Sequence, residues 1–151
     1  MGHAHQKRIL VIEDDSTYAR LWGRLLKEMG FPRATIVNSA KKALKIIKKE
    51  NFDLMISDVT LSTMNGYLLA QKIRELRPYI EVLLTTGYQT DLSRFDLKSP
   101  KFHLLHKPYH NLDLIRQLVG KLLNHQNPQE GFDEDSFSEN EDYPNITEWN
   151  L

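Results

Sequence analysis

The sequence contains no cysteine among its 151 residues. This absence excludes disulfide bonds, thiolate metal sites and a cysteine nucleophile, so the fold must depend on an ordinary hydrophobic core. Long apolar runs are also missing. No stretch approaches the roughly 20 residues that a membrane-spanning helix needs, and the segment from Met1 to Arg8 lacks the apolar centre of a secretion signal. We therefore expect a cytoplasmic protein with no membrane segment and one compact domain.

Lysine and arginine are missing from the last part of the chain. All 20 of them lie between Lys7 and Lys121, with only 12 Asp and Glu up to Leu123, which gives this part a net charge of +8. From Asn124 to Leu151 there are eight acidic residues and no basic one, a net charge of −8. The neutral total therefore hides two regions of opposite charge.

The acidic region also differs from the rest in composition. It mixes Asn, Gln, Pro and Ser with acids and isolated aromatics, a composition that does not support a core by itself. We therefore expect a folded domain over residues 7–123, preceded by an N-terminal extension or tag remnant at 1–6. A flexible acidic tail is expected at 124–151.

Short apolar stretches alternate with amphipathic ones along the folded region. The apolar stretches, typical of buried strands, lie at residues 8–12, 34–37, 52–57, 80–84 and 102–105. Helical patterns run from Ser16 to Gly30, from Asn38 or Ser39 to Lys49, from about Gly66 to before Pro78, more weakly from Asp91 to Leu97, and from Leu112 to Leu123. Strict alternation predicts an α/β fold, a doubly wound five-stranded parallel sheet with five helices.

Acidic, hydroxyl and basic side chains follow four of the expected strands. They are Glu13, Asp14 and Asp15 after the first strand, Asp58 after the third, Thr85 and Thr86 after the fourth, and Lys107 after the fifth. The carboxyl ends of parallel strands meet at one edge of the sheet, where ligands of such folds bind. The pattern predicts that carboxylates, a hydroxyl and an ammonium group gather there.

Clustered carboxylates repel one another unless a cation lies among them, and hard divalent cations prefer such oxygen ligands. Mg²⁺ takes one or two carboxylates and keeps positions for water or phosphate oxygens, so the pattern indicates a site for phosphoryl transfer. A carboxylate can then act as the nucleophile and form an acyl phosphate. A lysine and a hydroxyl can stabilise the charge of the transferred group.

In combination, these motifs resemble the receiver domain family of response regulators in two-component signalling, over about residues 7–123. The matching segments are Ile9-Leu10-Val11-Ile12-Glu13-Asp14-Asp15, Asp58 to Met64-Asn65-Gly66, Leu84-Thr85-Thr86-Gly87 and Lys107-Pro108. The resemblance implies a flavodoxin-like sheet with strand order 2-1-3-4-5. It also implies a cis peptide bond before Pro108.

The resemblance implies the following roles for single residues. Asp58 accepts the phosphoryl group, Thr86 and Lys107 contact it, and Mg²⁺ is held by Glu13, Asp14, Asp58 and the backbone carbonyl of Thr60. The donor is the phosphohistidine of a histidine kinase or a histidine phosphotransfer protein. The implied protein is a signalling switch that acts on an unidentified downstream protein and catalyses only its own phosphorylation and dephosphorylation; a homodimer is also considered.

Three positions depart from the family pattern or are specific to this chain. Ser62 stands where the family usually has proline, and Leu104 stands where it has an aromatic residue three positions before the lysine. The resemblance therefore leaves open whether this chain uses the family's aromatic readout of phosphorylation. The position two residues after Thr86 tunes hydrolysis in the family, and we expect the bulky Tyr88 there to slow attack by water.

Other functions are weighed against this one. The chain could be the receiver segment of a hybrid histidine kinase. An aspartyl-phosphate phosphohydrolase would carry a second aspartate two residues after the nucleophile, where Thr60 stands, so this class is disfavoured. The lysines of residues 41–49 indicate a solvated helix face, and specific nucleic-acid binding is not expected without an aromatic platform or a recognition domain.

Overall fold

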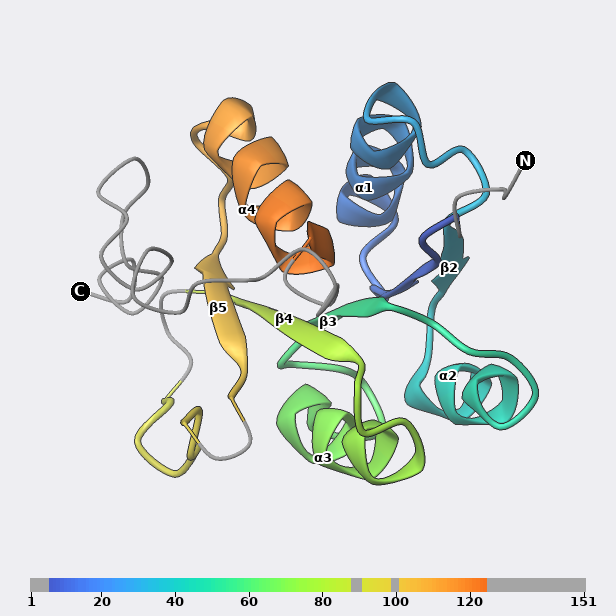
Figure 1. Cartoon of the computed structure of the whole chain (residues 1–151). Coiled ribbons are helices and arrows are strands. Elements are labelled where there is room, and N and C mark those ends of the chain that lie inside the picture. Colours follow the sequence, from blue (N-terminus) through green and yellow to red (C-terminus); the bar gives the residue numbers. More distant parts are fainter. Residues whose placement is uncertain (1–5, 88–90, 99–100, 125–151) are drawn as a thin grey trace.

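The computed structural model describes residues 6–87, 91–98 and 101–124. Within them lies a five-stranded parallel sheet with strand order β2-β1-β3-β4-β5 (Figure 1). The strands are β1 (Ile9–Ile12), β2 (Thr35–Val37), β3 (Leu54–Asp58), β4 (Glu81–Thr86) and β5 (His103–His106). The predicted fold class and strand order are confirmed. Some of the predictions concern residues outside the described ones, namely residues 1–5, Tyr88 and the tail at 125–151.

Helices cover both faces of this sheet, as the prediction of a doubly wound fold requires. They are α1 (Ser16–Glu28), α2 (Ala40–Ile47), α3 (Gly66–Leu76) and α4 (Leu112–Asn124). Helices α1 and α4 lie on one face, and α2 and α3 lie on the other (Figure 1). None of the helices in the described parts of the chain is long and apolar enough to cross a membrane.

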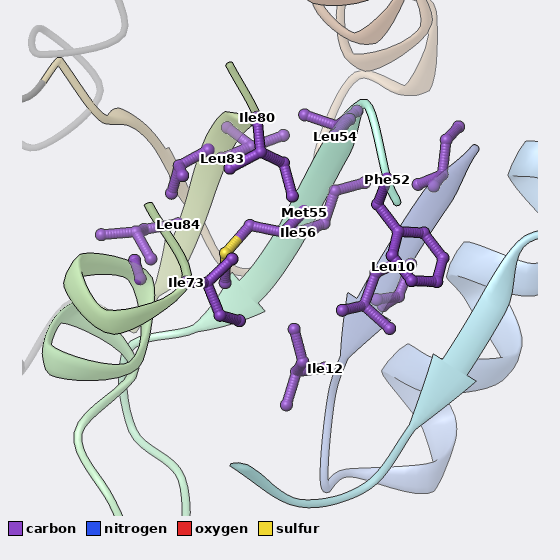
Figure 2. Packing of buried hydrophobic residues seen from close by; sticks show 14 of the residues in the cluster. Leu10, Ile12, Phe52, Leu54, Met55, Ile56, Ile73, Ile80, Leu83 and Leu84 are labelled. Carbon is purple, nitrogen blue, oxygen red and sulfur yellow. The ribbon is translucent and has the colours of Figure 1, made fainter. Parts of the chain in front are cut away.

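The central strands are buried on both faces, which explains their continuous apolar sequences. Every residue of β1 and β3 is buried. Side chains such as Leu10 and Met55 pack between the sheet and its helices, with Ile73 of α3 closing one side (Figure 2). This packing fixes the strand ends, and with them the residues that follow β1, β3, β4 and β5.

The helix ends follow mostly from local sequence. Ser39 caps α2 by accepting a hydrogen bond from the backbone N–H of Lys42. Gly30, with φ of 96°, follows α1 in the left-handed conformation that favours glycine. Asp15 caps α1, because its carboxylate accepts a hydrogen bond from the backbone N–H of Thr17 at 2.8 Å.

The predicted weak helix from Asp91 to Leu97 is wrong, because the structure has no helix in residues 91–98. Two aspartates explain the local conformation. The Asp91 carboxylate accepts a hydrogen bond from the backbone N–H of Ser93 at 2.9 Å, and that of Asp96 accepts from Lys98 at 3.0 Å. Such side-chain bonds compete with helical backbone bonds. The described part of the chain therefore carries four helices rather than five.

Tertiary contacts from α3 also hold this segment in its non-helical form. The Tyr67 hydroxyl donates to the carbonyl of Asp96 at 3.0 Å and accepts from its backbone N–H at 3.1 Å. Phe95 stacks on the Tyr67 ring with centroids 4.6 Å apart, and Phe102 meets the same ring edge-on at 5.6 Å. These ring contacts stabilise the segment in its non-helical conformation.

Candidate functional site

Three carboxylates meet at the carboxyl ends of the neighbouring strands β1 and β3. Glu13 and Asp14 follow β1, Asp58 ends β3, and one oxygen of each lies within 4.8 Å of the others. Glu13 is 2% exposed and Asp58 is 9% exposed, whereas Asp14 is exposed. The fourth acid of the sequence pattern, Asp15, serves as the cap of α1. The arrangement concentrates negative charge at one edge of the sheet.

Lys107 joins two of these carboxylates from the end of β5. Its Nζ atom donates to Glu13 Oε1 at 2.6 Å and to Asp58 Oδ2 at 2.8 Å. The backbone N–H of Lys107 donates to the carbonyl of Thr86 at 2.8 Å, and a cis peptide bond links Lys107 to Pro108. The strand ends therefore bring together residues that lie 94 and 49 positions apart in sequence.

The electrostatic environment is mixed. Burial raises the pKa of Glu13, and this effect exceeds the lowering by the hydrogen bond from Lys107. Burial alone would lower the pKa of Lys107, but hydrogen bonds to Asp58 and Glu13 raise it above its ordinary value. Lys107 therefore remains an ammonium group. One ammonium among three carboxylates leaves the site with excess negative charge, a donor set that suits a hard divalent cation.

The loop after β3 is folded closely around Asp58. The backbone N–H of Thr60 donates to Asp58 Oδ1 at 2.9 Å, so both carboxylate oxygens of Asp58 have partners. Gly66 closes the loop, since its N–H donates to Val59 O at 2.7 Å. A Cβ atom at this position would lie 2.0 Å from Asp58 O. Only glycine therefore permits this close approach.

The hydroxyl of Thr86 lies at the end of β4, beside the other site strands. Thr86 is fully buried, and its hydroxyl donates to the carbonyl of Gly87 at 3.3 Å. Its neighbour Thr85 is the register partner of Asp58 across β3 and β4. The structure thus places Thr86 at the end of β4, with its hydroxyl bonded to the backbone rather than to Asp58 or Lys107.

An aromatic group beside Lys107 was not assigned to the site from sequence. Tyr18 and Trp22 are four residues apart, the spacing of one helix face, and Tyr109 follows the Lys107-Pro108 motif. The Tyr18 ring centroid lies 4.0 Å from the Lys107 Nζ atom. Burial raises the pKa of Tyr109, whose hydroxyl accepts from Trp22 Nε1 at 3.1 Å. The available signal was the adjacency of Tyr109 to the lysine motif.

Leu104 lies inside the core at the middle of β5, with 1% of its surface exposed. The nearest aromatic residue along the chain, Phe102, is also buried and packs against the Tyr67 ring. The departure at Leu104 therefore places an aliphatic side chain at the position of the family's aromatic residue.

Comparisons with known proteins agree with this geometry. Residues 9–119 match the family model of the response regulator receiver domain. The response regulator receiver protein CpdR of Brucella abortus is 28% identical over 118 residues, which cover 78% of this chain and 98% of that protein. The transcriptional regulatory protein ZraR of Escherichia coli is 30% identical over 118 residues but is matched over only 26% of its length.

Another relative is a kinase, the sensor histidine kinase RcsC of Escherichia coli, which is 33% identical over 112 residues that make up 12% of its length. Among solved structures, a CheY-like receiver domain protein from Methanospirillum hungatei superposes with a TM-score of 0.67 at 28% identity, covering 82% of this chain and 98% of that one. The family model matches most of the chain, and the observed strand order is the one that the resemblance implied. This chain therefore belongs to the response regulator receiver domain family.

Proposed function

We propose that Asp58 accepts a phosphoryl group from the phosphohistidine of a partner histidine kinase or histidine phosphotransfer protein. In this reaction the P–N bond to the donor imidazole breaks, and a P–O bond to a carboxylate oxygen of Asp58 forms. The product is an acyl phosphate on this chain. The receiver would then act as a signalling switch, because the modified site changes its affinity for a downstream protein.

The observation that carries the proposal is the position of Lys107. Its ammonium group contacts both the proposed nucleophile, Asp58, and the neighbouring Glu13, at 2.8 and 2.6 Å. It can therefore stabilise the negative charge of a group attached to Asp58 without a large movement of the backbone. The Thr86 hydroxyl, at the adjacent strand end, is the proposed second contact for that group.

The carboxylates supply the proposed Mg²⁺ ligands. Glu13, Asp14 and Asp58 offer oxygens within 4.8 Å of one another, and the backbone carbonyl of Thr60 is the proposed fourth donor. When bound, Mg²⁺ would neutralise phosphoryl charge and orient the transferred group. The chain's own contribution is to hold the carboxylates close together and to keep Lys107 charged.

The protein context is part of the proposal. We assign the receiver to residues 7–123 and treat the acidic segment at 124–151 as a separate tail. The match to a portion of RcsC favours a second context, the receiver segment of a hybrid histidine kinase. A phosphohydrolase is disfavoured, because Thr60 occupies the place of the second aspartate.

Labelling with a small acyl-phosphate donor tests the function directly. We expect the wild-type protein to be labelled only when Mg²⁺ is present, and Asp58→Asn to remain unlabelled. Asp15→Asn is the matched control: it removes a neighbouring acid, while asparagine caps a helix as well as aspartate does. Labelling without a divalent cation, or labelling of Asp58→Asn equal to that of the wild type, would sink the proposal.

A further inference from the structure

Tyr18, Trp22 and Tyr109 form an aromatic cluster, in which the Tyr18 ring contacts Lys107. Tyr18 and Trp22 lie one helical turn apart on α1, and Tyr109 lies two residues after Lys107. Lys107 Nζ is 4.0 Å from the centroid of the Tyr18 ring. This geometry is a cation–π contact, in which the negative face of the ring attracts the ammonium group.

The Tyr18 ring is itself held in place. Its edge-to-face contact with Tyr109 has centroids 5.2 Å apart and an interplanar angle of 76°. Tyr109 in turn makes an edge-to-face contact with Trp22 at 5.6 Å, and Trp22, 1% exposed, donates its indole N–H to the Tyr109 hydroxyl. The buried Trp22 therefore anchors Tyr109, and Tyr109 orients Tyr18.

The first turn of α1 fixes the backbone of Tyr18 as well. The Asp15 carboxylate accepts hydrogen bonds from the backbone N–H groups of Thr17 and Tyr18, at 2.8 and 3.4 Å. Because Asp15 follows Glu13 and Asp14 directly, the segment that carries the carboxylates also carries the ring.

Lys107 needs such a support. Its ammonium group sits on a flexible four-carbon stem and has three donors, of which two hydrogen bonds go to Glu13 and Asp58. When the charge on Asp58 changes, these bonds must rearrange. A cation–π contact tolerates sideways displacement better than a hydrogen bond does, because the ring presents a broad negative face.

We propose that Tyr18 is a positioning residue for Lys107: its ring keeps the ammonium group over the carboxylate cluster while the group attached to Asp58 changes. The inference rests on the proposed function for its kinetic consequence, but the contact itself can be tested on the unmodified protein.

The contact is tested first without phosphorylation. In the full-length protein, the aromatic ring should shift the NMR signals of the Lys107 side-chain CH₂ groups upfield. We expect this shift to persist in Tyr18→Phe and to disappear in Tyr18→Leu. Equal Lys107 shifts in the wild type and Tyr18→Leu would overturn the proposal, whether or not Asp58 accepts a phosphoryl group.

The kinetic test uses the acyl-phosphate donor with Mg²⁺ at saturating and at limiting donor concentrations. For Tyr18→Leu we expect the maximal labelling rate to fall about three- to tenfold, the range of a partly exposed cation–π contact, with little change in the half-saturating donor concentration. Tyr18→Phe should stay within about twofold of the wild type because it retains the ring. Tyr79→Leu, a tyrosine that is 90% exposed, is the control.

The outcomes separate positioning from plain packing. If Tyr18 only stabilised the fold, Tyr18→Leu would lower the unfolding midpoint while the properly folded fraction reacted at the wild-type rate, and the proposal would be wrong. It would also be wrong if Tyr18→Phe lost as much rate as Tyr18→Leu. If no variant and no wild-type protein were labelled, the proposed function would fail, and the Lys107 shifts alone would decide the contact.

Discussion

The ammonium group of Lys107 balances part of the negative charge of the carboxylate cluster. Lys107 lies between Glu13 and Asp58, while the exposed Asp14 adds a further carboxylate to the same cluster. A buried carboxylate without an ion-pair partner destabilises the fold much more than a paired one does. The lysine therefore stabilises the cluster, and in the proposed function it would also contact the phosphoryl group.

Removal of that ammonium group should slow the chemistry of the protein that remains folded. We predict that Lys107→Gln lowers the rate of Mg²⁺-dependent labelling by about 100-fold, comparable to the loss of one preorganised donor to a developing charge. Lys101→Gln, an exposed lysine just before the same strand, should react at nearly the wild-type rate. Rates measured by phosphoprotein gel or intact mass check this, and similar rates for the two variants would argue against a role for Lys107.

Glu13 gives a pH-dependent prediction. Burial raises the pKa of Glu13 in the folded state, so the folded protein binds a proton at this carboxyl more tightly than the unfolded chain does. The resulting contribution to the free energy of unfolding is complete below the ordinary carboxyl pKa and is lost as the pH rises through the folded-state pKa. Without divalent cations, Glu13→Gln should therefore be more stable than the wild type at pH 7, with the difference shrinking toward pH 4. Urea unfolding across this range measures it. A variant less stable than the wild type at pH 7 would contradict the assignment.

At the scale of elements, the sequence predicted strands better than helices. Apolar runs located all five strands, but β3 and β4 extend further than predicted, to Asp58 and Thr86. Backbone pairing continues through these polar residues because it does not depend on apolar side chains. The predicted helix at 91–97 failed because its conformation depends on contacts with Tyr67, which lies far away in the sequence.

The loop between β3 and α3 should not tolerate a side chain at Gly66. A Cβ atom there would lie 2.0 Å from Asp58 O, so we expect Gly66→Ala to lower the free energy of unfolding by about 2 kcal/mol or more. Gly120→Ala is the matched control, because nothing lies within 4 Å of a Cβ atom there, in the middle of α4. It should be neutral or stabilise by about 0.5–1 kcal/mol. Denaturant unfolding compares the two, and equal stabilities would contradict the close approach.

The non-helical segment at residues 91–98 should loosen when its contact with α3 is removed. Tyr67→Phe keeps the stacked ring but loses the hydroxyl that bonds both the N–H and the carbonyl of Asp96. We expect the Asp96 amide to exchange about five- to tenfold faster, the effect of roughly one lost hydrogen bond. The amide of Leu83 in β4 is the reference. Unchanged exchange at Asp96 would show that Tyr67 does not hold this segment.

At the scale of the whole molecule, the order of the strands in the sheet brings the residues of the site together. Residues from Glu13 to Lys107 meet because β1, β3, β4 and β5 are adjacent and parallel, and this could be predicted from the alternation of elements and from the acids and lysine at strand ends. The aromatic cluster of Tyr18, Trp22 and Tyr109 could not be predicted in the same way. Tyr18 and Trp22 show ordinary helical spacing, and the contacts of Tyr18 with Lys107 and of Trp22 with Tyr109 join residues that lie far apart in the sequence.

The most direct test of the central claim is to locate the phosphoryl group by mass spectrometry after reaction with an acyl-phosphate donor. We predict one Mg²⁺-dependent modification, on the peptide that contains Asp58. The nearby acids Glu13, Asp14 and Asp15 and the histidines of the chain should remain unmodified. A phosphoryl group found on any of those residues, with Asp58 unmodified, would contradict the account.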